Sequence, residues 1–256
     1  FGVVTSFLFQ LHEMQREVVT GYFAYPLSEV KQVLRFYAEH SIDLPDEMSM
    51  GAGIGNRPGQ EPSLGIYFIW CGDAKDAEKH IAPLRKAGTV VFEGIQTRDY
   101  VAVQRSGDSG DVREFTGQMK SGFVTEITDE FIDKLVDNFE VHPDRGTRVG
   151  FAHQGGAISR VGRTETAYSQ REAQYTLMSF VSWAPGADGT EHSKYIDSHW
   201  SNVEPLTTGF YVNDYFDHTS EQVSQTYREN FPRLLEVKKE YDPTNLFRLN
   251  ANIRAS

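Results

Sequence analysis

The sequence predicts an α+β fold, a large and mostly antiparallel sheet backed by helices. Strand-like stretches come in pairs around short polar turns, which is typical of hairpins. Single helical stretches separate the pairs, and no strand is followed by the Gly-x-Gly-x-x-Gly turn and helix that mark a dinucleotide-binding parallel sheet. The 256 residues suit one large domain or one and a half, and no linker or repeat divides them.

The chain opens on a predicted strand over residues 2–11, in which Val3, Phe7 and Phe9 share the more apolar face. Neither an initiator Met nor a signal-peptide pattern precedes it, so we expect the chain to be the C-terminal part of a longer protein. A turn with Ser28 as N-cap should then begin a helix that ends near His40.

Strands and helices alternate through the rest of the chain. The sequence predicts further strands at 47–54, 64–70, 89–93, 122–125, 147–153, 157–161 and 173–183, with hairpin turns at 55–62 and 154–156. It predicts helices at 73–86, from Thr128 onward, and at 193–202, 223–230 and 232–241. Pro83 should break the first of these helices, and Gly88 should end it.

The composition excludes several classes of function. A formal charge of −11 argues against nucleic-acid binding, because a surface that follows phosphates needs clustered Lys and Arg. No apolar run is long enough to span a bilayer, so we expect a soluble protein, either cytoplasmic or secreted. The single cysteine excludes an internal disulfide framework.

No metal or hydrolase site is predicted. His192 and His199 lack a third ligand at metal-binding spacing, so we expect them on a solvated helix face. The chain has no Gly-x-Ser-x-Gly turn of the kind that presents a nucleophilic serine.

Tyr211 is the candidate catalytic residue. In a predicted strand over 210–213, Tyr211 and Asn213 would project to one side and place a phenol beside a carboxamide. A tyrosine near a cation or an oriented dipole can act as a general base toward a hydroxyl group. A half-buried tyrosine with one hydrogen bond explains the same pattern, and the residues alone leave both interpretations open.

The last residues also allow two interpretations. If residues 246–253 are extended, Asn250 and Asn252 lie on one side of the strand. Their amides could hydrogen-bond a planar heteroaromatic ring or could cap neighbouring backbone.

At four places the sequence resembles a known family, the berberine-bridge-enzyme-like FAD-linked oxidases of the vanillyl-alcohol-oxidase superfamily. The resemblance spans the chain and is most specific near its ends. It rests on Phe1-Gly2-Val3-Val4-Thr5-Ser6-Phe7, on Thr166-Ala167-Tyr168 with Arg171 in the stretch that runs to Trp183, on Tyr211-Val212-Asn213, and on Tyr241-Asp242-Pro243-Thr244-Asn245-Leu246-Phe247.

The resemblance implies a domain organisation. Residues 1–11 would be the last strand of an FAD-binding domain, 12–205 the substrate-binding domain, and 206–256 a return to the FAD-binding domain. The N-terminal half of the FAD domain, with its pyrophosphate loop, would be a partner that this sequence does not contain.

The resemblance also assigns site residues. Tyr211 would be the base, and FAD would contact Tyr211 and further positions of the two terminal segments: Phe1, Gly2, Val3, Val4, Asn213, Asn250 and Asn252. Gln154, Thr176 and Met178 would face a small-molecule substrate. Met178 departs from the polar residues that relatives often have there, and since a thioether cannot move a proton, proton transfer would fall to Tyr211 or to groups such as His153 and Gln154.

The predicted function is therefore FAD-dependent oxidation of an alcohol or a similarly activated C–H group, by hydride transfer to the flavin and with oxygen as the expected acceptor of its electrons. The alternative is a non-catalytic ligand-binding or scaffold domain that has lost the flavin. Met178 and the missing half of the FAD domain keep this alternative open.

Overall fold

The computed structural model describes residues 1–256 except 57–60, 109–114, 215–218, 250 and 255–256. Its strands are β1 (Glu17–Pro26), β2 (Met48–Asn56), β3 (Ser63–Trp70), β4 (Phe92–Asp99), β5 (Thr116–Val124), β6 (Gly146–His153) and β7 (Tyr175–Trp183). Its helices are α1 (Val30–His40), α2 (Ala77–Ile81), α3 (Tyr100–Arg105), α4 (Asp129–Asp137), α5 (Thr190–Val203), α6 (Ser220–Tyr227) and α7 (Phe231–Tyr241). Short 3-10 turns lie at 27–29, 82–86, 204–206 and 228–230.

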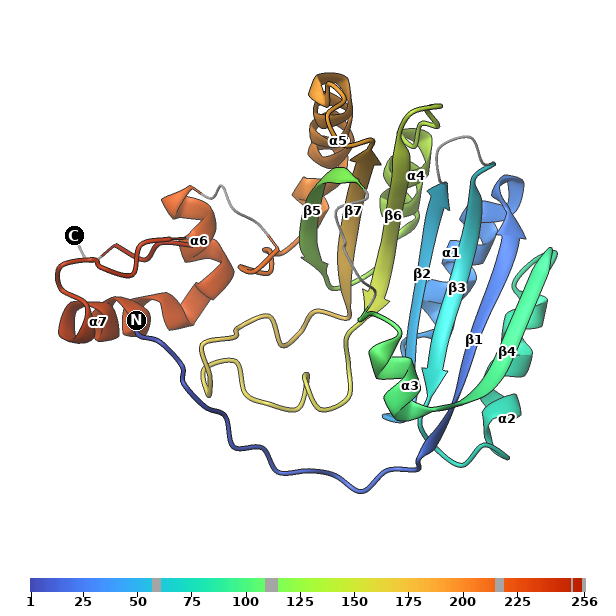
Figure 1. Cartoon of the computed structure of the whole chain (residues 1–256), viewed down its shortest axis with the longest axis horizontal. Helices are drawn as coiled ribbons and strands as arrows, with labels where there is room; N and C mark the ends of the chain where they lie inside the picture. Colours follow the sequence, from blue (N-terminus) through green and yellow to red (C-terminus); the bar gives the residue numbers. More distant parts are fainter. Residues whose placement is uncertain (57–60, 109–114, 215–218, 250, 255–256) are drawn as a thin grey trace.

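The seven strands form one sheet in the order β4-β1-β3-β2-β6-β7-β5, and every neighbouring pair is antiparallel. Helices α1, α4 and α5 cover one face, and Figure 1 views the opposite, open face. This arrangement confirms the predicted fold class.

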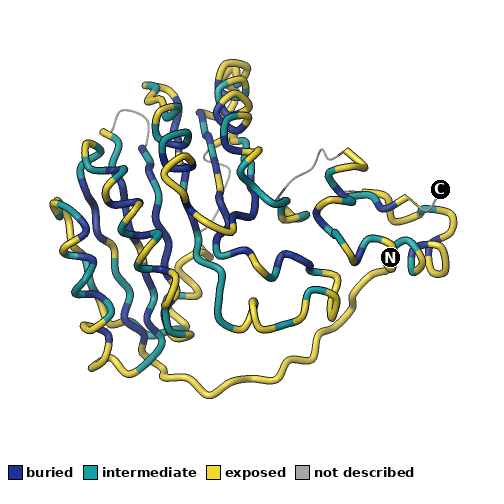
Figure 2. The backbone as a smooth tube through the Cα atoms, turned by 180° about the vertical axis from the view of Figure 1, so that it is seen from behind, coloured by how far each residue is buried: buried dark blue, intermediate teal, exposed yellow. Residues whose placement is uncertain are grey.

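The core lies between the sheet and these helices. Alternate residues of the central strands point into it, and those of β1, β3 and β7 include Phe23, Ile66 and Leu177, all fully buried. Seen from behind in Figure 2, burial follows the strands and the inner sides of the helices. Each such side chain stabilises the fold by about 1.5–3 kcal/mol.

The helix predictions hold where an apolar stripe repeats. The helix predicted from Thr128 onward is α4, and the Thr128 side chain caps it by accepting a hydrogen bond from the backbone N–H of Phe131 at 3.2 Å. The predicted helix over 73–86 is α2 followed by a 3-10 turn that contains Pro83. Ser28 is not an N-cap, since it lies inside the 3-10 turn that precedes α1 and no side chain caps either element.

Several strand predictions are wrong. Residues 2–11 form no strand, because no described segment lies beside them to accept their backbone hydrogen bonds, and Phe7, Leu8 and Phe9 are exposed. Residues 157–161 form turns rather than the second arm of a hairpin. The strand predicted over 89–93 begins later, at Phe92, and β1 was not predicted at all.

The C-terminal segment lies to one side of the sheet, and Figure 1 shows the N-terminus beside α7. Lys238 of α7 is fully buried; its Nζ contacts the Asp242 carboxylate, donates to the backbone oxygen of Phe247 at 2.7 Å and lies 5.1 Å from the centre of the Phe1 ring. Burial acts to raise the pKa of Asp242, but hydrogen bonds from Lys238 and from the backbone N–H groups of Leu246 and Phe247 hold it below its usual range. The turn at 242–245 that follows α7 is therefore anchored by Lys238 and Asp242.

Candidate active site

Tyr211 is positioned by a chain segment that extends the sheet. Phe123 of β5 donates its backbone N–H to the oxygen of Gly209, and Thr208 donates to the oxygen of Phe123, both at 2.8 Å. Gly209 has φ +140°, where a side chain is strained, and a Cβ there would lie 2.5 Å from the side-chain nitrogen of Gln170. The segment that leads to Tyr211 therefore requires glycine.

Thr226 of α6 holds the next residue. Its hydroxyl accepts from the backbone N–H of Phe210 at 2.9 Å and donates to the Phe210 oxygen at 2.8 Å. Gln170 donates to the Thr226 oxygen at 3.2 Å, and Ser169 donates to the same oxygen at 2.8 Å. The approach to Tyr211 is thus fixed from both sides.

Tyr211 and Asn213 lie in a turn and not in the predicted strand, because the backbone N–H of Asp214 donates to the Tyr211 oxygen at 3.0 Å. The turn still brings the two side chains together. The Asn213 amide donates to the Tyr211 hydroxyl oxygen at 2.7 Å, and Tyr211 is 40% exposed. The phenol therefore receives one hydrogen bond and stays accessible.

Tyr211 lines a cavity of about 330 Å³ together with Gln154 and Thr176, which the sequence also singled out. The side-chain nitrogen of Gln154 donates to the Thr176 hydroxyl. The remaining lining residues are Phe123, Ile158, Tyr168 and Arg171. Residues from β5, β7, the 154–171 segment and the Tyr211 turn thus meet at one place.

Tyr168 was missed as a site residue. Its hydroxyl donates to the Gln154 side-chain oxygen at 3.0 Å, and the Arg171 guanidinium lies 4.8 Å from its ring centre. Burial raises the pKa of Tyr168, the charge of Arg171 opposes this shift, and nearby Tyr211 adds to it. Tyr168 therefore remains a neutral donor that orients Gln154, and the sequence signal for it was the Thr166-Ala167-Tyr168 motif with Arg171.

Two predicted positions lie elsewhere. Met178 is on the same face of β7 as Thr176, but it lines a neighbouring hollow. His153 points to the helix-covered face, where its ring lies 5.9 Å from that of Tyr175 and burial lowers its pKa. His153 therefore faces away from Tyr211.

The paired histidines of α5 are not solvated as expected. His192 is 6% exposed and packs on Trp183 and His142, and His199 is 3% exposed, with its Nε2 3.2 Å from the Leu135 oxygen. Within the described residues no group of three His, Cys, Asp or Glu side chains could hold a metal ion. No helix of the described chain is long and apolar enough to cross a membrane.

Comparisons with known proteins show which proteins the chain resembles. The profile described as "Berberine and berberine like" matches residues 210–254, which include the Tyr211 turn. The (R)-6-hydroxynicotine oxidase of Paenarthrobacter nicotinovorans is 28% identical over 265 residues, covering 99% of this chain and 57% of that protein. An FAD-linked oxidoreductase of Dictyostelium discoideum is 24% identical over 261 residues, covering 99% of this chain and 55% of that protein.

The chain is similar to FAD-linked oxidoreductases over nearly its whole length, and to the berberine-like family over residues 210–254. It spans about half the length of the relatives that it matches. Two solved structures share the fold. A chitooligosaccharide oxidase has a TM-score of 0.81 and 18% identity, and the match covers 95% of this chain and 56% of that chain. The 6-hydroxy-D-nicotine oxidase of Arthrobacter nicotinovorans has a TM-score of 0.77 and 22% identity, and the match covers 96% of this chain and 57% of that chain.

Relatives of this chain are FAD-linked oxidoreductases, which supports FAD as its cofactor, and some terminal residues of the chain fit a bound group. The Asn252 side-chain oxygen is buried without a hydrogen-bond partner among the described residues, so it is free to accept one from a ligand. Asn213 and Val3 are exposed. Asn250 lies outside the described residues.

Proposed function

We propose that this chain is the substrate-binding and C-terminal part of an FAD-dependent oxidase that converts an alcohol, or a similarly activated C–H group, to the carbonyl level. Tyr211 accepts the proton of the substrate hydroxyl. FAD, when bound, takes up the hydride from the adjacent carbon, and oxygen receives the electrons. Several relatives carry the name oxidase, which supports oxygen as the acceptor.

The observation that carries the proposal is the accessible phenol of Tyr211 at a cavity with a polar wall. The hydrogen bond from Asn213 to the phenol oxygen stabilises the phenolate form of Tyr211, which is the form that can take up the substrate proton. Gln154 and Thr176, on the wall of the same cavity, offer hydrogen bonds to a substrate hydroxyl. The cavity can thus orient an alcohol toward Tyr211.

The N-terminal FAD-binding half of the same protein is the partner that we propose for this chain, because the relatives extend over about twice its length. Phe1–Val4, Tyr211, Asn213, Asn250 and Asn252 are the positions that we propose to contact FAD from this side. We assign residues 1–11 and 206–256 to the FAD-binding domain and 12–205 to the substrate-binding domain.

Changing Tyr211 to Phe in the complete, flavin-containing protein tests the role of the phenol. Loss of a positioned proton acceptor should slow flavin reduction by roughly a hundred- to ten-thousandfold. Stopped-flow absorbance of the flavin under anaerobic conditions measures this rate.

Tyr241→Phe is the matched control, because Tyr241 is 67% exposed at the end of α7, and its rate should stay that of the wild type. An unchanged rate for Tyr211→Phe excludes the proposed role. A complete protein without flavin absorption bands would favour a non-catalytic ligand-binding or scaffold domain.

A further inference from the structure

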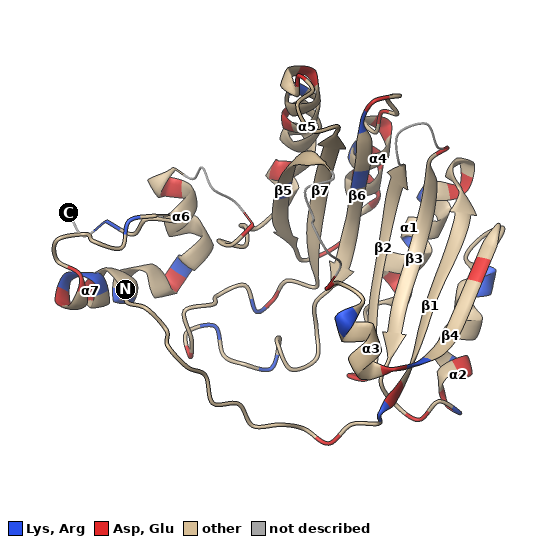
Figure 3. Ribbon diagram, in the orientation of Figure 1, with Lys and Arg blue, Asp and Glu red and all other residues tan. Residues whose placement is uncertain are grey.

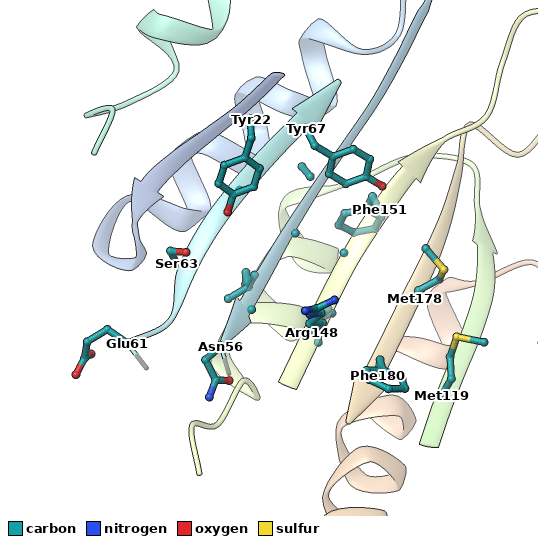
Figure 4. Close-up of a pocket in the computed structure, with 17 residues that line it drawn as sticks. Tyr22, Asn56, Glu61, Ser63, Tyr67, Met119, Arg148, Phe151, Met178 and Phe180 are labelled. Carbon is teal, nitrogen blue, oxygen red and sulfur yellow. The ribbon is translucent and has the colours of Figure 1, made fainter. Parts of the chain in front are cut away.

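A second hollow, of about 640 Å³, lies on the open face of the sheet next to the Tyr211 cavity (Figure 4). We call it the glycine trough. Its floor is backbone and its two sides are large apolar side chains: Gly53, Gly55, Gly65 and Gly150 form the floor, Tyr22 and Tyr67 one side, and Met119, Met178 and Phe180 the other.

Strand register places the trough and the cavity on the same face. Thr176 of β7 pairs with Ala152 of β6, and Ala152 pairs with Gly51 of β2. Gly51 pairs with Tyr67 of β3, and Tyr67 pairs with Tyr22 of β1. Directly paired residues of antiparallel strands project to the same side, so Tyr22 and Tyr67 project from the same face of the sheet as Thr176, which lines the Tyr211 cavity.

The tyrosine side chains lean over glycines. A Cβ on Gly51 would lie 2.2 Å from the Tyr67 ring, and a Cβ on Gly65 would lie 2.3 Å from the Tyr22 hydroxyl. Any larger residue at these two positions would push the rings out of the trough. Tyr67 nevertheless stays 45% exposed, so an aromatic surface remains open to a ligand.

The middle of the floor is bare backbone. Cβ atoms added to Gly53 and Gly150 would meet backbone oxygens of the paired strand at 2.9 and 2.7 Å. Met178, 37% exposed, borders this strip on the side of the cavity. A backbone floor between aromatic rings and a thioether accommodates a flat, apolar ligand.

Arg148 is the only cationic side chain among the described residues that line the trough. It pairs in register with Gly55 and Phe180, and a Cβ on Gly55 would lie 3.3 Å from its Cγ, so its stem lies across that glycine. The structure gives its guanidinium no hydrogen bond or ion pair with any described residue. Glu61, the other charged lining residue, lies at the outer edge in Figure 4.

The surroundings make this cation distinctive. The whole chain carries a formal charge of −11, and Figure 3 shows the central strands almost without charge apart from β6. A guanidinium that has no ion pair among the described residues and lies beside an apolar slot favours an anionic group, and its planar fork matches a carboxylate.

The trough also sets a length. Phe180 lies four positions beyond Thr176 on β7, which corresponds to about 13 Å along a strand. Arg148 lies beside Phe180 on the next strand. A ligand that reaches from the Tyr211 cavity to this guanidinium therefore has roughly the length of two aromatic rings with their substituents.

We propose that the substrate is a flat, largely apolar molecule with a carboxylate at the end opposite to the oxidised carbon, and that Arg148 binds this carboxylate. The proposal rests on the function proposed above, since it places the oxidised carbon at Tyr211. It defines the substrate class by shape, polarity and the position of one charge.

The test compares two probes on the complete, flavin-containing protein: 4′-(hydroxymethyl)biphenyl-4-carboxylate and its methyl ester. The wild type should show a lower KM for the acid. Arg148→Gln should raise the KM of the acid by roughly ten- to a hundredfold, since a bidentate charged contact is lost. The KM of the ester and the limiting rate of flavin reduction should stay within a factor of about three, because the reacting end of the probe is unchanged.

Arg233→Gln is the matched control, because Arg233 is an exposed arginine of α7, away from the sheet, and its loss changes the net charge equally. Tyr67→Leu should raise the KM of the acid and of the ester alike, because it removes an aromatic side chain from one side of the trough. Equal KM values of the two probes on the wild type, or an equal loss for both in Arg148→Gln, overturns the proposal.

Binding of 4′-methylbiphenyl-4-carboxylate, which has no hydroxyl to oxidise, separates this proposal from the proposed function. Calorimetry should give a Kd that rises in Arg148→Gln even if Tyr211→Phe leaves flavin reduction unchanged. Slow flavin reduction in Tyr211→Phe, combined with a Kd that is the same in Arg148→Gln and in the wild type, would support the proposed oxidase function and contradict the proposed carboxylate site.

Discussion

At the scale of single residues, the position of Tyr211 depends on side chains that never face the substrate. Gly209 supplies a backbone conformation that other residues adopt only with strain, and Thr226 closes two hydrogen bonds on Phe210. The turn at Asn213 then brings the amide to the phenol. None of these contacts follows from alternation along a strand. The sequence therefore predicted correctly that Tyr211 and Asn213 are neighbours, but it placed them on a strand instead of in a turn.

Thr226→Val keeps the shape of the side chain and removes both hydrogen bonds to Phe210. Loss of these two part-buried hydrogen bonds should lower the free energy of unfolding by about 1–3 kcal/mol. It should also slow flavin reduction by roughly ten- to a hundredfold, because Tyr211 loses its anchor.

Urea unfolding and stopped-flow reduction of the complete protein measure the two effects of Thr226→Val. The control is Thr116→Val at the exposed start of β5, which should change neither. A destabilised Thr226→Val protein with the full reduction rate would show that the anchor stabilises the fold without positioning the phenol.

At the scale of elements, the sequence predicted best where one stripe of side chains decides. The apolar spacing of Val30, Val33, Leu34 and Tyr37 gave α1 its correct extent, and Thr128 marked the start of α4. The sequence did not predict which strands pair when they lie far apart along the chain. Residues 2–11 have the composition of a strand but no partner strand among the described residues, and β1 pairs with β3 and β4, which follow much later in the sequence.

The candidate site shows the same division. Gln154, Thr176 and Tyr211 were named from the resemblance, and the structure places them at one cavity, whereas Met178 and His153 lie elsewhere. The glycine trough could not be found from the sequence, because Tyr67 and Arg148 share a face only through the register of three strands, β3, β2 and β6. Their roles stay predictions until the variants are measured.

The contact between α5 and α4 gives a prediction about pH. Burial lowers the pKa of His199, against the hydrogen bond with the Leu135 oxygen. Below about pH 6.5 the unfolded chain takes up a proton at this residue that the folded chain resists, so stability falls as the pH decreases from 7 toward the lower, folded-state pKa.

His199→Gln should therefore flatten the fall in the free energy of unfolding between pH 7 and 5 by at most about 1.4 kcal/mol per pH unit. Urea unfolding at several pH values measures the slope. Part of the slope should remain, because burial also lowers the pKa of His40, His153 and His192. His12→Gln, at an exposed position, is the control, and an identical slope in both variants would place the effect elsewhere.

At the scale of the whole molecule, the chain combines a closed core with surfaces that nothing in the described structure covers. The helices shield one face of the sheet, whereas the other carries the Tyr211 cavity and the glycine trough. Residues 1–11 are exposed along their length, including Leu8 and Leu11. This distribution suits a substrate half that is completed by a flavin-binding half.

Residues 1–256 produced alone should therefore retain little FAD. The positions proposed to contact FAD lie at the two ends of the chain, and the sequence has no Gly-x-Gly-x-x-Gly turn between a strand and a helix that would hold a pyrophosphate. The measurement is the visible spectrum after incubation with FAD and desalting, with the complete protein as the positive control and a circular dichroism spectrum to establish that the shorter chain is folded. Flavin bands near stoichiometry in the folded shorter chain would contradict the proposal that the N-terminal half is needed to hold FAD, because they would place the whole cofactor site within these residues.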